Sequence, residues 1–180
     1  MISAVTIDPL VALATIALEV ATVAFLALFF LRKQFPDLND IGDVLARWGI
    51  WIAFALTLGG VAMSLLYSEV FGFAPCGLCW VQRIFLYSQA AMFGLAAIRN
   101  DTRIADYSIL LSIFGGIVAL YNHYLQMGGT SILPCPTTAA QAVDCAQRFF
   151  FEFGYLTFPL VGFSLFAFLI VLMLFVRERK

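Results

Sequence analysis

The sequence predicts an all-α integral membrane protein, a helical bundle in which a four-helix core is preceded by one additional N-terminal transmembrane helix. Of the 180 residues, 63% are hydrophobic and 12% are charged, whereas soluble domains are about half apolar and roughly a quarter charged. Such a chain would expose large apolar patches in water, so its composition places it in a lipid bilayer. The formal net charge of -1 gives no indication of nucleic acid as a partner.

Five apolar runs each come close to the roughly 20 residues that a spanning helix needs. They occupy residues 10–31, 48–67, 80–98, 104–125 and 155–176. Their interiors lack proline apart from Pro159, near the start of the last run. We expect helices, because unpaired backbone groups are costly in lipid and the alternating pattern of barrel strands is missing.

The first run is expected to stay in the protein, because no basic segment precedes it and it is longer than the apolar core of a signal peptide. Glu19 falls near its middle. An ionisable group at that depth is costly, so we expect Glu19 to be paired or protonated. Two regions are predicted: the extra helix with its polar loop, 1–47, and the four-helix bundle, 48–180.

Small residues and short links indicate how the later helices pack. Gly59-Gly60 and Gly115-Gly116 lie inside the second and fourth runs, where small residues let membrane helices approach closely. The tight link at 99–103 predicts that the third and fourth helices are antiparallel neighbours. Asp106 is expected near the interface, where water can solvate it.

The long segment 126–154 separates the fourth and fifth runs. It opens with Gly128-Gly129, which permits bends. From Thr138 to Phe151 we predict a short amphipathic helix that lies on the membrane surface.

Basic residues predict the orientation of the bundle. If all five runs span the membrane, eight Lys and Arg residues share one side: Arg32, Lys33, Arg47, Arg99, Arg103, Arg177, Arg179 and Lys180. The opposite side has Arg148, with Arg83 just inside its helix. The basic side is expected to be cytoplasmic, so the N-terminus and both cysteine-bearing loops face outward, where disulfides persist.

The four cysteines form two pairs, Cys76 with Cys79 and Cys135 with Cys145, each in a polar break beside an apolar run. A C-x-x-C pair suits redox exchange, and two such pairs suggest that electrons pass between them. Purely structural disulfides and a zinc site are the alternatives. We predict no metal site, because a zinc ribbon normally uses two close pairs and nine residues separate Cys135 from Cys145.

The position of Cys79 predicts a stabilised thiolate. We expect the third helix to begin at Trp80, which places Cys79 near the N-cap, where the helix dipole is positive. Arg83 lies one turn further on the same face, and both effects favour thiolate over thiol. The adjoining apolar surface makes a lipid-soluble quinone the natural electron acceptor. Alternatively, Arg83 is an interfacial residue that snorkels.

Cys135 is predicted to react with another protein. Pro134 and Pro136 flank it and restrict the backbone to extended forms, which leaves the sulfur accessible. We expect Cys135 to form a mixed disulfide with a soluble partner and Cys145 to resolve it. The alternative is a static disulfide that staples a loop.

His123, the single histidine of the chain, is placed at the outer end of the fourth helix. There it could donate a hydrogen bond to a quinone carbonyl or help a proton reach it. The alternative is a histidine that the interface merely accommodates.

Several of these residues together resemble the disulfide bond formation protein B family (DsbB and its BdbC-type relatives). The resemblance covers roughly 48–176. It rests on the string from Pro75 to Arg83, on Tyr121-Asn122-His123, on the Cys135 and Cys145 loop, and on the string from Gly154 to Pro159.

The resemblance implies a four-helix bundle in the bacterial cytoplasmic membrane that reoxidises a periplasmic thioredoxin-fold protein similar to DsbA. Electrons would pass to ubiquinone or menaquinone. By similarity, Cys79 is the thiolate next to the quinone and Cys76 its disulfide partner, while Arg83 and His123 lie near the quinone. Cys135 would accept the donor's attack, and Cys145 would complete the outer disulfide.

Two features depart from the family pattern: the extra helix at 10–31 and a Cys135–Cys145 spacing shorter than in the best-known branch. Three other functions are alternatives. A vitamin K epoxide reductase-like enzyme would carry its quinone-proximal motif late in the bundle, whereas Cys76 and Cys79 come first here. A non-catalytic scaffold would hold two static disulfides. A reductant importer would need cysteines within the span, reachable from both sides.

Overall fold

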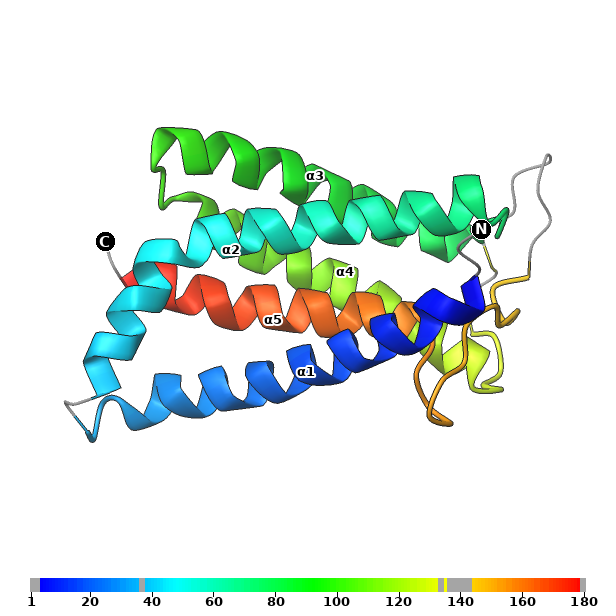
Figure 1. The fold of residues 1–180 in the computed structure, drawn as a ribbon, viewed down its shortest axis with the longest axis horizontal. Coiled ribbons are helices and arrows are strands. Elements are labelled where there is room, and N and C mark those ends of the chain that lie inside the picture. The colour runs from blue at the N-terminus through cyan, green and yellow to red at the C-terminus, as the bar shows by residue number, and fades with distance from the viewer. Residues whose placement is uncertain (1–3, 36–37, 133–134, 136–143, 179–180) are drawn as a thin grey trace.

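The structure, a computed structural model, is an all-α bundle that describes residues 4–35, 38–132, 135 and 144–178 (Figure 1). Its helices are α1 (Ala4–Leu31), α2 (Asn39–Leu65), α3 (Gly77–Arg99), α4 (Ile104–Gln126) and α5 (Phe158–Glu178). A π-helical turn, η2 (Leu66–Val70), continues α2. The predicted fold class is confirmed, including the additional N-terminal helix.

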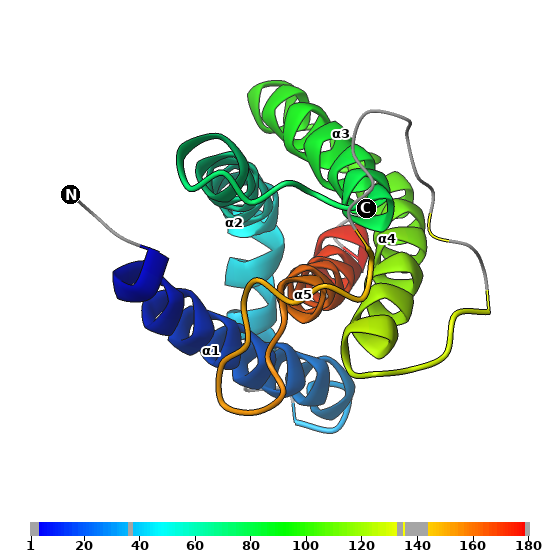
Figure 2. The same ribbon diagram turned by 90° about the vertical axis from the view of Figure 1, so that its right-hand side faces the viewer.

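Four helical stretches of the described chain are long and apolar enough to cross a membrane: Thr6–Leu31, Asn39–Val70, Ile104–Gln126 and Phe158–Glu178. The remaining helix, α3, is 23 residues long, or about 34 Å at 1.5 Å per residue. Gln82, Arg83 and Gln89 reduce its hydropathy. It nevertheless lies beside α2 and α4 along the length of the bundle (Figures 1 and 2).

Helix α5 occupies the centre of the bundle and packs against α1, α2 and α4 (Figure 2). Its large side chains, among them Phe166, Leu169 and Leu172, are fully buried. Gly115 of α4 allows this approach: a Cβ there would lie 2.6 Å from Phe166 Cζ. Close packing is therefore confirmed at Gly115 and at Gly60, where a Cβ would lie 3.0 Å from Leu165 Cδ2, whereas a Cβ on Gly59 would meet nothing within 4 Å.

The additional helix α1 is held to α5 by polar as well as apolar contacts. Glu19 Oε1 accepts a hydrogen bond of 2.8 Å from Ser164 Oγ, and the Tyr155 hydroxyl lies 3.5 Å from Glu19 Oε2. The pairing expected for Glu19 is thus present. Outward-facing residues of α1 such as Val20 and Val23 remain exposed, as lipid-facing side chains do.

At the end of the bundle where α1 and α5 finish, ion pairs join the helices. Arg32 pairs with Glu178, and Arg177 Nε lies 3.1 Å from Asp106 Oδ1. Asp106 is half-exposed at this end, as predicted. The tight turn between α3 and α4, with Asn100 in the left-handed conformation at the C-cap, makes these helices neighbours, also as predicted.

The predicted surface helix is wrong where the structure describes it. Residues 144–151 contain turns and no helix, while 138–143 lie outside the described residues. Aromatic side chains explain the difference: Phe149 stacks on Phe73 at 5.3 Å, and buried Phe150 stacks on Phe158 at 4.8 Å. The segment therefore plugs the end of the bundle instead of lying along a membrane surface.

Candidate active site

The C-x-x-C motif forms the first turn of α3. Cys76 is the N-cap, with extended backbone (φ -70°, ψ 170°), and its Sγ accepts a hydrogen bond of 3.3 Å from the Cys79 N–H. This is the bond with which an N-cap side chain satisfies a free N–H of the first turn. The helix begins at Gly77 and not at Trp80, so the N-cap predicted for Cys79 belongs to Cys76.

Hydrogen bonds make Cys76 the more acidic thiol of the reduced pair. The Sγ atoms of Cys76 and Cys79 lie 2.6 Å apart. The hydrogen bond from the Cys79 thiol, with smaller contributions from the Cys79 N–H and Asn122, lowers the pKa of Cys76 to about 7 even though burial opposes the charge. The thiolate that the sequence predicts at Cys79 is therefore favoured at Cys76 while both thiols are reduced.

Asn122 contacts both sulfur atoms and was not identified from the sequence as a site residue. It is fully buried on α4, with Nδ2 at 3.5 Å from Cys79 Sγ and 3.7 Å from Cys76 Sγ. Its Oδ1 is buried without a hydrogen-bond partner in the described part of the chain. The sequence feature that points to Asn122 is a polar amide at the end of an apolar run, directly before His123.

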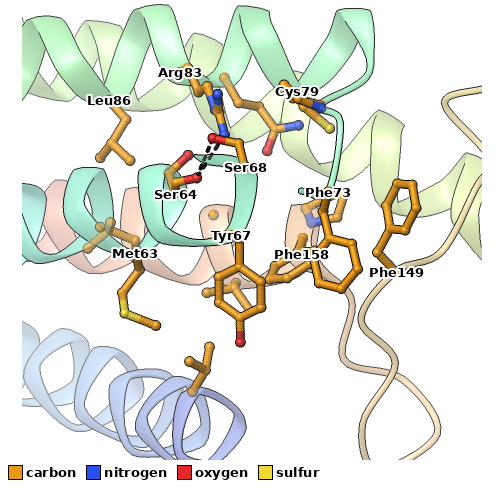
Figure 3. Close-up of a pocket in the computed structure, with 18 of the residues that line it drawn as sticks. Met63, Ser64, Tyr67, Ser68, Phe73, Cys79, Arg83, Leu86, Phe149 and Phe158 are labelled. Atoms are coloured by element: carbon orange, nitrogen blue, oxygen red, sulfur yellow. Dashed lines mark hydrogen bonds between the residues drawn. The ribbon is translucent and has the colours of Figure 1, made fainter. Parts of the chain in front are cut away.

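Arg83 reaches across to α2. Its Nη2 donates a hydrogen bond of 2.8 Å to the Ser64 carbonyl (Figure 3). Its guanidinium carbon lies 5.1 Å from the centre of the Trp80 ring. The residue is 9% exposed, so it does not snorkel to the surface. The hydrogen bonds at the two sulfurs come from the Cys79 thiol, the Cys79 N–H and Asn122. Arg83 lines the same cavity as Cys79.

The second pair, Cys135 and Cys145, forms a disulfide. Cys145 is 1% exposed and packs in one cluster with Cys76 and Leu125, and Cys79 and Cys135 lie at the edge of this cluster. The structure therefore brings all four predicted cysteines together. The predicted effect of Pro134 and Pro136 on the backbone lies outside the described residues.

His123 is directed toward α5. Its Nδ1 lies 2.8 Å from the Thr157 hydroxyl, which is buried just before the helix. His123 is not among the residues that line the cavity described next, whereas Cys79 and Arg83 are. Its predicted role near a quinone remains a prediction.

A cavity of about 580 Å³ opens beside the C-x-x-C motif, between α1, α2, α3 and α5 (Figure 3). Polar groups gather at its cysteine end, where Cys76, Cys79 and Arg83 line it. Deeper walls are apolar and include Met63 and Leu86 (Figure 3). Size, apolar walls and a few convergent polar groups are typical of a site for a small organic molecule.

These features fit a membrane quinone. The ring needs a flat apolar slot and a hydrogen-bond donor for its carbonyl oxygens. The apolar walls and the Arg83 guanidinium, itself anchored by Ser64, supply both beside a dithiol. The residues of the cavity therefore match the cofactor that the resemblance implies.

Comparisons with known proteins agree with this geometry. The sequence model of the family "Disulfide bond formation protein DsbB" matches residues 46–176. Disulfide bond formation protein C of Bacillus subtilis (strain 168) is 31% identical over 133 residues, 72% of this chain and 91% of the relative. No solved structure gives a significant match.

Two further relatives carry related names. Probable disulfide formation protein C 1 of Bacillus anthracis is 36% identical over 119 residues, 64% of this chain and 80% of the relative. The SPbeta prophage-derived disulfide bond formation protein B of Bacillus subtilis (strain 168) is 32% identical over 131 residues, 72% of this chain and 86% of the relative. The matched region contains all four cysteines, Arg83 and Asn122, and leaves α1 outside.

Three observations lead to one assignment: a family match over most of the chain, two cysteine pairs in one cluster, and an apolar cavity beside the C-x-x-C motif. The chain belongs to the disulfide bond formation protein DsbB family, membrane enzymes that oxidise protein dithiols and pass the electrons to a quinone.

Proposed function

We propose that this protein reoxidises a thioredoxin-fold dithiol protein, similar to DsbA, at the outer face of a bacterial cytoplasmic membrane, with ubiquinone or menaquinone as the acceptor. The observation that carries the proposal is the position of Cys76. It packs in one cluster with Cys145 and also lines the cavity beside α3. One residue therefore adjoins both the outer disulfide and the quinone site.

The first half of the reaction is thiol–disulfide exchange at the outer pair. A thiolate of the donor attacks Cys135 Sγ, a mixed disulfide forms, and Cys145 leaves as thiolate. Cys145 then attacks Cys76 Sγ of the oxidised inner pair, which joins the two pairs and releases Cys79 as thiolate. Each step exchanges one S–S bond for another, and its rate depends on thiolate character and access.

The second half restores both pairs. The second thiolate of the donor attacks the mixed disulfide, so that the donor leaves oxidised and Cys135 becomes thiolate. Cys135 attacks Cys145, which re-forms the outer disulfide and leaves Cys76 and Cys79 reduced. A bound quinone supplies the acceptor for the two electrons and two protons released when the inner disulfide re-forms.

The chain's own residues prepare the inner pair for this transfer. Asn122 donates to both sulfurs, which stabilises whichever of them is anionic. Arg83, held by Ser64, would orient the ring of the acceptor next to Cys79. The apolar walls exclude water from the site and keep the thiolate reactive toward the acceptor.

The proposed orientation places the cysteine cluster outside and the C-terminus in the cytoplasm. Arg32 and Arg177 lie at the opposite end of the bundle from the cysteines, together with Arg99 at the end of α3 (Figure 1). The excess of Lys and Arg marks the cytoplasmic side of membrane proteins. An outer location also provides the oxidising compartment in which the Cys135–Cys145 disulfide persists.

Reconstitution tests the proposal. The purified protein would be mixed with a reduced thioredoxin-fold donor and a quinone, and the absorbance of the quinone would be followed. The expected result is quinone reduction that disappears in Cys79→Ser. Turnover that survives this substitution would eliminate the route through the inner pair.

Trapping in cells separates this function from a scaffold with static disulfides. In Cys145→Ser the residue Cys135 has no disulfide partner and stays a thiol. Its thiolate can attack the disulfide of the oxidised donor, which forms a mixed disulfide and releases one donor thiolate, so a covalent complex through Cys135 should accumulate. A scaffold would give no such complex.

A further inference from the structure

Helix α1 lies outside the region that matches the family, yet it forms one wall of the cavity beside the cysteines. The side chains that it contributes are spaced along one face: Ile7, Leu10, Val11, Ala14, Thr15 and Leu18. In Figure 3 this helix, in blue, runs below the labelled residues of α2. The bundle without α1 would leave this side of the cavity open to lipid.

The cavity is elongated along the helices. On α1 its lining extends from Ile7 to Leu18, twelve residues that span about 16 Å of helix. On α2 and η2 it extends from Ser68, at the cysteine end, to Leu56. A ring-sized molecule beside Cys79 would fill only the outer part of such a space.

The deeper part of the cavity has apolar walls on every helix that borders it. Leu18 of α1, Leu56 of α2 and Leu165 of α5 line this part. Under the proposed function the ring of the quinone lies at the polar end, next to Arg83. The isoprenoid chain attached to that ring then has a continuous apolar channel in which α1 is one side.

Two contacts hold α1 in this place. The Tyr67 hydroxyl donates a hydrogen bond of 2.5 Å to Asp8 Oδ1, which ties the outer end of α1 to η2. Ala12 is fully buried against Phe150 and Leu156, beside the start of α5. The helix is therefore fixed on both sides of the cavity, as a binding wall requires.

We propose that α1 binds the isoprenoid chain of the quinone and makes the enzyme selective for quinones that carry one. This inference rests on the proposed function, because it takes the ring position beside Cys79 and Arg83 from it. It assigns the role of α1 to residues that the family match does not include.

A pair of matched substitutions tests the role of α1. Ala14→Phe places a large ring in the channel, whereas Ala17→Phe makes the same change at an exposed position of α1 that does not line the cavity. Each variant would be titrated with a quinone that carries an isoprenoid chain and with one that bears a methyl group instead. Quenching of tryptophan fluorescence reports binding without turnover, since Trp80 contacts Arg83 at the ring site.

In Ala14→Phe we expect the dissociation constant of the chain-bearing quinone to rise by about tenfold, because overfilling a packed site typically costs this much or more. Binding of the methyl quinone should stay unchanged, which also shows that the variant is folded. Ala17→Phe should leave both constants unchanged. Equal weakening of both quinones by Ala14→Phe, or no weakening of either, would overturn the role of α1.

Failure of this inference can be told apart from failure of the proposed function. If α1 does not bind the chain, Ala14→Phe loses no selectivity but Cys79→Ser still abolishes quinone reduction. If the proposed function fails, either the unmodified protein reduces no quinone or Cys79→Ser still reduces it, whatever the substitution at Ala14 does.

Discussion

The two cysteine pairs belong to one cluster but are held in different ways. Cys76 and Cys79 belong to the cap and first turn of α3, and Asn122 of a neighbouring helix donates to both sulfurs. Cys135 and Cys145 lie on the connection between α4 and α5, where their own disulfide joins them. The inner pair is positioned by secondary structure, and the outer pair by a covalent bond and by the packing of Cys145.

The inner pair thus has a precisely fixed position, whereas the outer pair lies where another protein can reach it. Electron transfer to a small molecule needs sulfur atoms at a fixed place beside a cavity, which a helix end provides. Exchange with a large protein needs a sulfur that another chain can approach, and loops provide this more readily. The substitutions below test whether the two pairs can be impaired separately.

Removal of one cysteine from each pair should give the largest effect and opposite phenotypes. Cys79→Ser abolishes turnover but should still oxidise about one equivalent of donor, because the outer disulfide reacts once. Cys145→Ser has no outer disulfide, so it should oxidise none of the reduced donor. Quantifying free thiols of the donor after mixing distinguishes the two variants, and identical stoichiometry in both would contradict the division between the pairs.

Substitution of Arg83 should impair the inner pair alone. Arg83→Gln removes the positive charge and the guanidinium group that is hydrogen-bonded to the Ser64 carbonyl. We therefore expect KM for the quinone to rise by about tenfold or more. The amount of donor oxidised without quinone, about one equivalent for each of the two disulfides, should be unchanged. The matched control Arg148→Gln, at an exposed position, should leave KM for the quinone as it is.

Asn122 offers a finer test of how the inner pair is held. Asn122→Ala removes the donor to both sulfurs, and a hydrogen bond to a charged group contributes about 1.5–3 kcal/mol. The pKa of Cys76 should therefore rise by about one unit or more. The pH dependence of alkylation of the reduced inner pair measures this change.

Gln89→Ala is the matched control for Asn122→Ala, because Gln89 is a buried amide that accepts hydrogen bonds from Ser108 and Ser112, away from the cysteines. It should lower the stability of the bundle without moving the alkylation profile. An equal shift of the profile in both variants would mean that general loosening, and not the contact with sulfur, is being measured.

The smallest effect is expected in the unmodified protein as pH changes. With the pKa of Cys76 lowered to about 7, the reactive thiolate is fully populated above this pH and lost below it. The alkylation rate of the reduced inner pair should rise about fivefold from pH 6 to 7 and less than twofold from pH 7 to 8. A rate that keeps rising tenfold per unit up to pH 8 would exclude the lowered pKa.

The helices could be predicted because long apolar runs have few alternatives in a membrane. The predicted start of α3 lies three residues too late, because cysteine is not among the usual N-cap residues. Cys76 nevertheless takes that position. The prediction of a surface helix was wrong because Phe149 and Phe150, which fit an amphipathic pattern in the sequence, pack against aromatic rings at the end of the bundle.

The site was predictable where chemistry is carried by rare residue types, as with the four cysteines and Arg83. It was not predictable where a partner has no sequence signature. The acceptor for Arg83 is a backbone carbonyl of another helix, and Asn122 acquires its contacts only when α4 packs beside α3. The face of α1 that borders the cavity could not be predicted either, because the apolar run of this helix does not distinguish one face from another.

Cys76 lies between the outer disulfide and the apolar cavity. This position has a consequence for the kinetics of the enzyme. The protein donor, dissolved in water, and the quinone, dissolved in lipid, never need to bind at the same time. The enzyme stores the two electrons as reduced cysteines after the donor leaves and before the quinone binds. Double-reciprocal plots at several fixed concentrations of the second substrate should consequently be parallel lines.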